Sequence, residues 1–250
     1  MTLYGIDLWA AALVFARIGG ALMLMPGFGE AYVPPRARLA LAMALTVCLV
    51  PSLMNILPRN VPTTEWGMAG VVIGELMIGL IIGGVARTFM SALGTAGQIM
   101  GLESGLSFAT TADPTAEASG QIFSVFLGLM GATLIFSTDL HHLLLRGLAG
   151  SYGIFTPGAD VPIDDATALA VDTVAKSFLV GFQIAAPLLV AGIIFRLGLG
   201  ALARLIPTIQ VFFVVLPLQV LGAFVIIALG LSTGMLVWLD SIETYAKGLN

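Results

Sequence analysis

The sequence predicts an all-α, polytopic protein whose helices are membrane-associated and arranged as hairpins. Hydrophobic residues make up 58% of the 250-residue chain and charged residues only 10%, whereas soluble domains usually contain about 45–50% apolar and about 25% charged residues. The apolar residues also gather in long runs between short polar stretches, which is typical of helices that cross a bilayer. These two observations exclude an ordinary water-soluble fold.

Six apolar segments form the predicted helical framework, and each is near the length of about 20 residues that a spanning helix needs. They comprise residues 8–25, 39–57, 68–86, 122–137, 178–195 and 211–239. The last segment is longer than a hydrocarbon core of about 30 Å requires, so we expect it to tilt, kink or fold back. Pro187 and Pro217 are candidate kinks, because proline removes a helical hydrogen-bond donor. We expect residues 138–177 to serve mainly as a connection.

The charge balance argues against nucleic acid as a partner. Ten Lys and Arg stand against 14 Asp and Glu, for a formal net charge of -4, whereas proteins that bind nucleic acid present a basic surface.

The first segment is preceded by Asp7 and contains Arg17, so we expect a retained helix and not a cleaved signal peptide. Cys48 is the single cysteine. It can form no intrachain disulfide, and its apolar surroundings predict a buried position.

Glycine recurs at four-residue spacing in several of these segments. The sets are Gly79 and Gly83; Gly97, Gly101 and Gly105; and Gly230 and Gly234. This spacing places small residues on one face of a helix, where two backbones can approach closely and pack without help from the hydrophobic effect. Glycine is also simply frequent in membrane helices, so each pair has two interpretations. The triple set is the stronger candidate for tight helix packing.

Arg17 and Glu75 are ionisable residues inside apolar segments, where a buried charge is costly and a functional role is the first hypothesis. The two side chains could pair with each other across helices. The alternative is a proton or ion relay, which usually needs a chain of such groups, and the other acidic residues lie near segment ends. We therefore predict a structural role for this buried pair.

The run TDLHHLL places Asp139, His141 and His142 close enough together to suggest metal ligands. Zinc sites use three or four protein ligands with supporting hydrogen bonds, and the sequence supplies no further histidine or nearby cysteine. We predict no metal site and no cofactor, and interpret the run as a polar helix end.

Two other functional classes remain as alternatives. GLSFA, which contains Ser107, resembles a nucleophile elbow distantly, but it lacks the final glycine and follows no strand. An intramembrane enzyme built on Ser107, His141 and His142 is thus poorly supported, and we predict that the chain is not an enzyme. An ion-coupled transporter would need a polar site at the membrane midplane and internal repeats, and only Arg17 and Glu75 offer such a site.

Four stretches carry a more specific signal. They read PGFGEAYVPPRARLALAMALT, GELMIGLIIGGVARTFMSALGTAGQIMGLESGLSFATTADP, TDLHHLLLRGL and PTIQVFFVVLPLQVLGAF. In order and approximate spacing they resemble the signature regions of the FliR family of type III export-gate components, over nearly the whole chain. The related injectisome T component is the nearest alternative. The patterns AGQxxGxxxGLSFA, HHLLL and QVFFVVLPLQ look more like the flagellar branch.

The resemblance implies a structural and gating subunit of the flagellar type III export gate, in the inner membrane at the flagellar basal body. A single copy would assemble with the family's P and Q subunits, beside FlhB-like and FlhA-like export components, into a pore for unfolded export substrates. Residues 1–160 would resemble a P subunit, and residues 161–250 would form a Q-like helical hairpin. In this family such hairpins are lifted partly out of the membrane plane, so the six segments need not be six conventional spans.

The resemblance also implies a pore plug over residues 105–120. The plug and gating residues would be Gly105, Leu106, Ser107, Phe108, Ala109, Thr110, Thr111, Asp113 and Pro114. Residues 105–112 carry no charge, and a stretch of this kind with a glycine hinge and Phe108 at its tip can close a narrow pore, because hydrophobic constrictions gate by dewetting. The family commonly has a second bulky apolar residue where this chain has Thr111, so the seal would rely more on Phe108 and on other subunits. A surface loop is the alternative interpretation.

Overall fold

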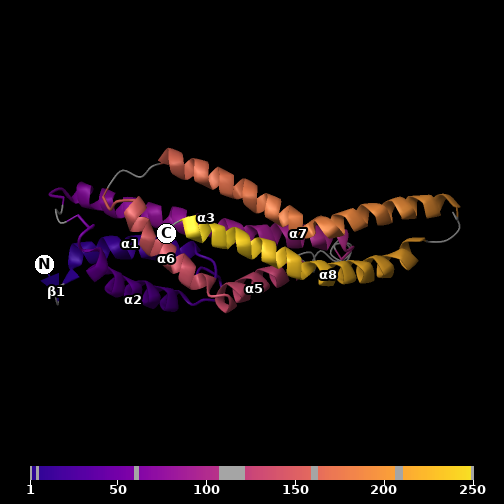
Figure 1. The fold of residues 1–250 in the computed structure, drawn as a ribbon, viewed down its shortest axis with the longest axis horizontal. Coiled ribbons are helices and arrows are strands. Elements are labelled where there is room, and N and C mark those ends of the chain that lie inside the picture. The colour runs from indigo at the N-terminus through magenta and orange to yellow at the C-terminus, as the bar shows by residue number, and fades with distance from the viewer. Residues whose placement is uncertain are drawn as a thin grey trace. The chain divides into compact units, whose positions relative to one another are not determined.

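The computed structural model describes residues 2–3, 6–58, 62–106, 122–158, 163–205 and 211–248. These residues are almost entirely helical, which confirms the predicted all-α class (Figure 1). The helices are α1 (Leu8–Leu24), α2 (Pro35–Leu53), α3 (Glu65–Glu103), α5 (Ile122–Ser137), α6 (Leu140–Ile154), α7 (Ile163–Leu205) and α8 (Val211–Gly248). Two short strands, β1 (Thr2–Leu3) and β2 (Ile6–Asp7), pair antiparallel before α1.

Each of the six predicted apolar segments falls largely on a helix, although residues 54–57 of the second lie beyond the end of α2. α5 has the predicted bounds, and α1 ends one residue earlier than expected. α3, α7 and α8 extend beyond their apolar segments into more polar sequence, because a helix continues as long as its backbone hydrogen bonds are satisfied, whatever the hydropathy. α7 and α8 also continue through Pro187 and Pro217.

One expectation was wrong: residues 140–154 form α6 and are not a connection. Leu140, Leu144 and Leu148 are buried at four-residue spacing, which is the pattern of one apolar face on a helix. The opposite face carries exposed polar residues such as Arg146, so the mean hydropathy of this stretch is low and a search for apolar runs misses it. α6 follows α5 at an angle of 75°, and Asp139 occupies the bend with a φ of 58°.

Among the residues that the structure describes, four helices are long and apolar enough to cross a membrane. They are Pro35–Leu53, Glu65–Glu103, Asp164–Leu202 and Val215–Gly248. The bent pair α5 and α6 could provide a fifth span that is broken in the middle, and α1 is a shorter apolar helix.

The local sequence helps to set the ends of some of these helices. α2 begins with Pro35, whose missing N–H costs nothing in a first turn, and α7 begins with Asp164 and Asp165, whose charges suit a helix N-terminus.

The described chain forms two compact units, each with its own core. Unit 1 comprises Met1–Thr88, Ala132–Val174 and Ser241–Asn250, and unit 2 comprises Phe89–Gly131 and Ala175–Asp240. Both units therefore draw on the N-terminal and C-terminal parts of the sequence. The predicted division at residue 160 concerns likeness to other subunits and not compactness, so it stays a prediction.

The core of unit 1 lies among α1, α2, α6 and the parts of α3 and α8 that belong to this unit. Its buried side chains include Leu13, Val14, Ile18, Leu22, Val50, Ile78, Ile82, Leu144, Leu148, Tyr152 and Ile242. Near the end of α8, the Tyr245 hydroxyl donates a hydrogen bond to the carbonyl of Ile82, with an oxygen–oxygen distance of 3.1 Å. The hydroxyl is thereby satisfied at the edge of an apolar core, as buried polar groups generally are.

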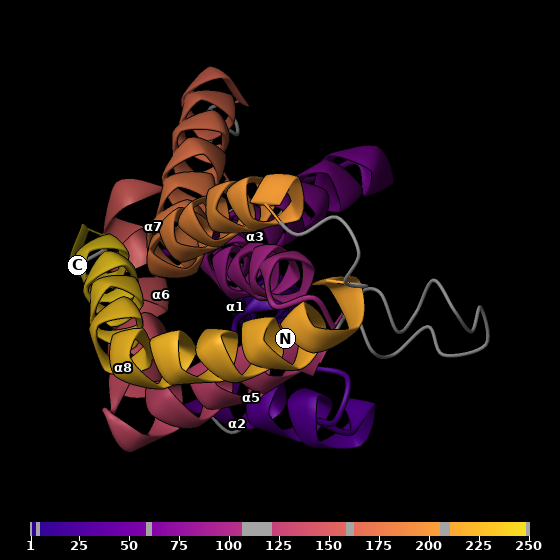
Figure 2. The same cartoon turned by 90° about the vertical axis from the view of Figure 1, so that its right-hand side faces the viewer.

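In unit 2, α3 contacts α5, α7 and α8 (Figure 2). The Trp238 side chain of α8 is fully buried, and its Nε1 donates a hydrogen bond to the carbonyl of Phe89 over 2.8 Å. On the α5 side, the rings of Phe123 and Phe224 lie 5.8 Å apart between centroids. Aromatic burial and one satisfied indole N–H thus hold α8 and α5 in this unit.

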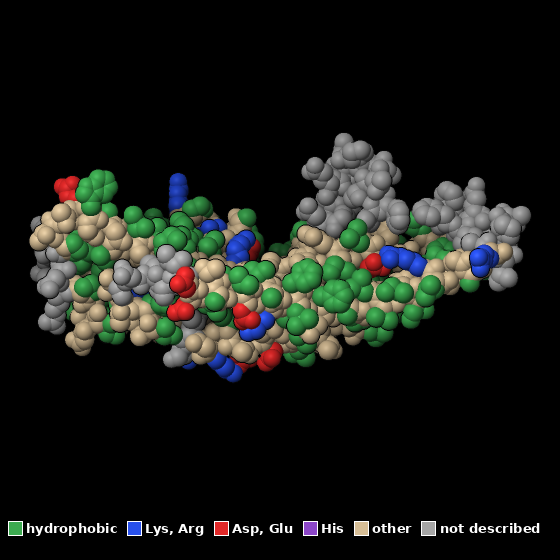
Figure 3. All heavy atoms as spheres, turned by 90° about the horizontal axis from the view of Figure 1, so that it is seen from above, with side chains coloured by type: hydrophobic (Ala, Val, Ile, Leu, Met, Phe, Trp, Pro, Cys, Tyr) green, Lys and Arg blue, Asp and Glu red, His purple; other side chains and the backbone are tan. Residues whose placement is uncertain are grey.

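A large share of the apolar side chains is exposed. Figure 3 shows many hydrophobic side chains on the surface of one face, interspersed with several charged groups. Trp66 is 89% exposed and Leu229 is 78% exposed. On a soluble protein, exposed apolar side chains are scattered singly and do not follow whole helices in this way. Cys48 is also exposed on α2. The expectation that it is buried was wrong because α2 leaves this apolar face, which also carries Met43 and Val47, exposed.

Candidate functional site

A buried ion pair joins α1 to α3 in unit 1. The Arg17 and Glu75 side chains are 0% and 1% exposed, and Arg17 Nε lies 2.7 Å from Glu75 Oε2. The structure therefore brings together the two ionisable residues that stand out in the sequence. A charged side chain in such a place is tolerated only when it is paired and its remaining hydrogen-bonding groups are satisfied.

The rest of the Arg17 guanidinium binds the end of α6. Nη1 donates to the carbonyl and hydroxyl oxygens of Ser151, over 3.3 and 3.4 Å, and Nη2 donates to the carbonyl of Phe155 over 3.0 Å. The guanidinium carbon also lies 4.1 Å from the centre of the Tyr152 ring, within the range of a cation–π contact. The Ser151 carbonyl also accepts the backbone N–H of Phe155, so Arg17 adds a second donor there and supplies one to the Phe155 carbonyl just past the helix end.

Glu75 is held from a second side as well. Its Oε1 accepts a hydrogen bond from the backbone N–H of Gly158 over 3.3 Å, so one carboxylate binds α1 through Arg17 and the segment after α6. Arginine does not release its proton in proteins. These contacts therefore favour a structural role for the pair over a proton relay.

Glycines allow α1 and α3 to pack backbone against backbone beside this pair. A Cβ atom on Gly79 would collide with the carbonyl oxygen of Arg17, and one on Gly83 would collide with that of Ala21. From the other side, a Cβ atom on Gly20 would lie 2.8 Å from the carbonyl oxygen of Leu76. The close approach places Arg17 within reach of Glu75.

The predicted glycine triple lies along α3 in unit 2, and its members differ in their surroundings. Gly97 packs against the backbone of Ser124 in α5, where a Cβ atom would collide with the Cα and N atoms. Gly101 is buried, and its carbonyl accepts a hydrogen bond from Ser104 Oγ over 3.0 Å. Gly105 adopts a φ of 80°, a left-handed conformation that other residues enter only with strain. A packing role for all three stays a prediction.

The predicted plug is described only at its start. Gly105 and Leu106 form a turn after α3, whereas Ser107, Phe108, Ala109, Thr110, Thr111, Asp113 and Pro114 lie outside the described residues. The turn is closed by Ser104, whose Oγ accepts a hydrogen bond from the backbone N–H of Leu106 over 3.4 Å. The gating role of the plug, residues 105–120, therefore stays a prediction.

The end of α3 also carries polar contacts that the sequence analysis missed. Arg196 Nη2 of α7 lies 2.9 Å from Glu103 Oε2, and Gln219 Nε2 of α8 donates to the Glu103 carbonyl over 2.8 Å. The Glu103 side chain is only 12% exposed. An acidic residue at the end of a weakly apolar stretch was a signal in the sequence, but its partners lie 93 and 116 residues away.

A cavity of about 210 Å³ lies beside these contacts in unit 2. Glu103 and Gln219 reach its wall, and its other lining is apolar, including Leu188, Phe195 and Leu218. Glu103 and Gln219 are thus polar groups in mainly apolar surroundings, where hydrogen bonds are stronger than in water.

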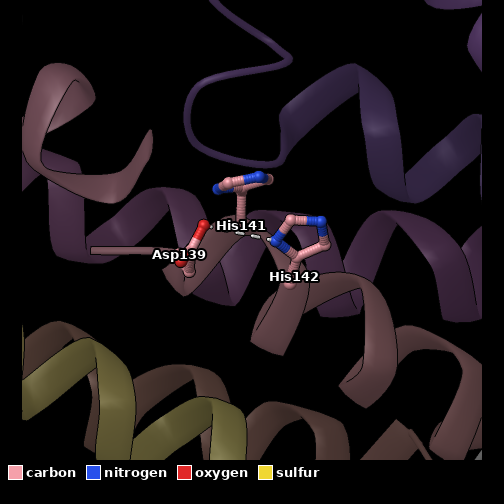
Figure 4. A group of neighbouring side chains, drawn as sticks. All are labelled: Asp139, His141 and His142. Atoms are coloured by element: carbon pink, nitrogen blue, oxygen red, sulfur yellow. Dashed lines mark ion pairs between the residues drawn. The ribbon is translucent and has the colours of Figure 1, made fainter. Parts of the chain in front are cut away.

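Asp139, His141 and His142 lie together at the bend between α5 and α6 (Figure 4). Their nearest ligand atoms are within 4.8 Å of one another, and His142 Nδ1 is 3.6 Å from Asp139 Oδ1. The His141 ring packs on Phe136 with a centroid distance of 5.1 Å, which accounts for its position without a metal. That the chain binds no metal stays a prediction. An enzyme site with Ser107 is also untested, because that residue lies outside the described residues.

The described part combines long apolar helices with a few buried polar contacts, of which the Arg17–Glu75 pair is one, and this composition fits a membrane component. A family model described as "Bacterial export proteins, family 1" matches residues 8–245. The chain belongs to this family. Bacterial export family 1 consists of export components and is not an enzyme class.

Named relatives within this export family divide between two systems. The flagellar biosynthetic protein FliR of Caulobacter vibrioides is 44% identical over 234 residues, which cover 94% of this chain and 93% of that protein. FliR of Bacillus subtilis is 30% identical over 232 residues, covering 91% and 88%. The Yop proteins translocation protein T of Yersinia pestis is 26% identical over 147 residues, covering 58% and 56%. These likenesses confirm the predicted family and its flagellar branch. The chain is a component of the flagellar export system in the inner membrane.

Proposed function

We propose that this chain is the structural and gating subunit of the flagellar type III export gate, where it lines part of the pore for unfolded substrates. The observation that carries the proposal is the likeness to a flagellar biosynthetic protein over 94% of the chain. A single copy assembles with P and Q subunits and meets FlhB-like and FlhA-like components.

The surface of the chain supports an assembled state. Apolar side chains are exposed along both helices of the proposed Q-like part, residues 161–250, and include Phe178, Phe182, Ile194, Leu221 and Leu229. Residues 1–160, the proposed P-like part, also expose apolar side chains, among them Met43, Trp66 and Ile73. Surfaces of this kind are covered by lipid or by partner chains. P and Q subunits with matching long apolar helices are partners of suitable chemistry.

Residues 105–120 act as the plug in this proposal. Gly105 ends α3 in a left-handed turn, a common way for a chain to leave a helix. The plug's uncharged first part, residues 105–112 with Phe108, closes the pore to water and ions and moves aside when a substrate chain enters.

Removal of the gene from its own bacterium is expected to abolish motility and secretion of flagellar proteins, because the export pore would be incomplete. Expression of this chain from a plasmid is expected to restore both. Secretion of hook and filament proteins into the medium is the measurement. Normal filament export in the deletion strain would contradict the proposal, and ion-coupled uptake driven by the purified chain alone in liposomes would favour a transporter.

Deletion of residues 108–111 is expected to make the assembled gate leaky to small ions while assembly stays intact. The physical reason is that the deletion removes the bulky apolar tip that keeps the pore dry. Ion conductance of purified complexes in planar bilayers measures the leak. The matched control is Phe108→Leu, which keeps a large apolar side chain and should stay closed. An unchanged resting conductance after the deletion would rule out the plug.

A further inference from the structure

The end of α3 is fastened from two directions in unit 2. The Glu103 carboxylate accepts a charge-assisted hydrogen bond from Arg196 of α7 over 2.9 Å, and the Glu103 carbonyl accepts one from Gln219 of α8 over 2.8 Å. The carbonyl belongs to the last turn of α3, where the helix itself supplies no donor. One residue thus uses its side chain and its backbone to bind two other helices.

Neighbouring residues fit this arrangement. The Glu103 carboxylate lies directly on Gly192 of α7, and a Cβ atom there would collide with Oε2. The Gln219 amide group lies 3.4 to 3.6 Å from the position that a Cβ atom would take on Gly105. A side chain at residue 192 would therefore displace the carboxylate, whereas a Cβ atom at residue 105 would make ordinary contact with Gln219 and be disfavoured only by its φ of 80°.

The burial of Glu103 indicates that its partners matter for position. Its side chain is 12% exposed, whereas Arg196 is 59% exposed. An ion pair on an open surface contributes little to stability, because water and salt screen it. Here the carboxylate has left most of its water, so the bond from Arg196 has to replace that solvation, and this fixes where the end of α3 can lie.

We propose that Glu103 is a positioning residue of the export gate, which anchors the C-terminal turn of α3 to α7 and α8 and so sets where the chain enters residues 105–120. The effect of this anchor on gating rests on the proposed function, because a plug seals a pore only when its base is held in place. The anchor itself is a property of Glu103, Arg196, Gln219 and Gly192.

The anchor can be measured without reference to transport. Spin labels are attached to Leu102 of α3 and Leu221 of α8, which are 63% and 66% exposed, in the full chain within its assembled complex. A Cys48→Ser background is required because Cys48 is exposed. Pulsed electron resonance then gives the distribution of distances between the two labels.

Three changes test the anchor by different routes. Glu103→Gln removes the charge but keeps the shape, Arg196→Gln removes the donor, and Gly192→Ala displaces the carboxylate while every charge is kept. Each is expected to raise about tenfold the population of conformations in which the end of α3 is detached from α7, because each removes one charge-assisted hydrogen bond. The double variant of residues 103 and 196 should be no worse than either single variant, because both remove the same interaction. Gly198→Ala on the same helix is the matched control, since no atom lies within 4 Å of the added methyl group.

The outcomes separate the anchor from the gate. Widened distances and a raised resting conductance in the Glu103→Gln and Gly192→Ala variants, with Gly198→Ala like the parent, support the proposal. Distances as narrow as in the parent overturn it, whatever the conductance. A second outcome also overturns it: the distances widen in the Glu103→Gln and Gly192→Ala variants but their pores stay closed, although deletion of residues 108–111 makes the pore leaky. If that deletion has no effect, the proposed plug fails, and the distances alone decide whether the anchor exists.

Discussion

Replacement of Arg17 with leucine is expected to lower the free energy of unfolding by about 3–5 kcal/mol, because it leaves the Glu75 carboxylate buried without its counterion. The Phe155 carbonyl loses the Arg17 donor at the same time, and the Ser151 carbonyl keeps only the backbone N–H of Phe155. Denaturant unfolding of the detergent-purified chain, followed by tryptophan fluorescence, measures the change. The yield of monodisperse protein should fall in parallel.

A double variant distinguishes a buried charge from a loss of packing. Arg17→Leu with Glu75→Leu removes both charges, and it is expected to be more stable than Arg17→Leu alone, since replacing a whole buried pair by apolar residues costs little. The control is Arg146→Leu, an exposed arginine on α6, which should change stability by less than about 0.5 kcal/mol. Arg17→Leu with the stability of the parent would show that the pair does not hold unit 1 together.

Replacement of Gly79 with alanine is expected to destabilise unit 1 by about 1–3 kcal/mol, because the added methyl group overlaps the backbone of α1. The obstructing atom is the carbonyl oxygen of Arg17, and a backbone atom cannot move aside as a side-chain tip can. The new separation also pulls Arg17 away from Glu75. The same unfolding measurement applies.

Gly70→Ala is the matched control for this change. Gly70 lies on the same helix, and no atom lies within 4 Å of its added Cβ. Alanine is favoured over glycine in a helix by about 0.5–1 kcal/mol, so this variant should be as stable as the parent or slightly more stable. Equal behaviour of the two variants would contradict backbone packing of α1 on α3.

The sequence was sufficient to predict the features that depend on local composition. The apolar run of α5 has the same bounds as the helix, because lipid-compatible residues and helix residues coincide there. Arg17 and Glu75 stand out because ionisable residues are rare in apolar segments. Residues 140–154 were missed because a helix with one polar face has a low mean hydropathy although its burial pattern is regular.

Other features could not be predicted, because their partners carry no signature in the sequence. Two of the groups that bind Arg17 are backbone carbonyls, of Ser151 and Phe155, and any residue type offers such a carbonyl. The contacts of Glu103 depend on how α7 and α8 pass the end of α3, and only the fold brings those residues together. Gly192 likewise gave no signal, since its role depends on a carboxylate that lies far away in the chain.

The partners of Arg17 impose an order on biosynthesis. Glu75 is made 58 residues after Arg17, and Phe155 is made 138 residues after it. At a translation rate of about 5–20 residues per second, the last partner follows about 7–28 s after Arg17 itself. α1 is thus among the first helices to leave the ribosome and among the last to reach its final environment. A newly made chain must keep this guanidinium hydrated, or paired with another group, until α6 arrives.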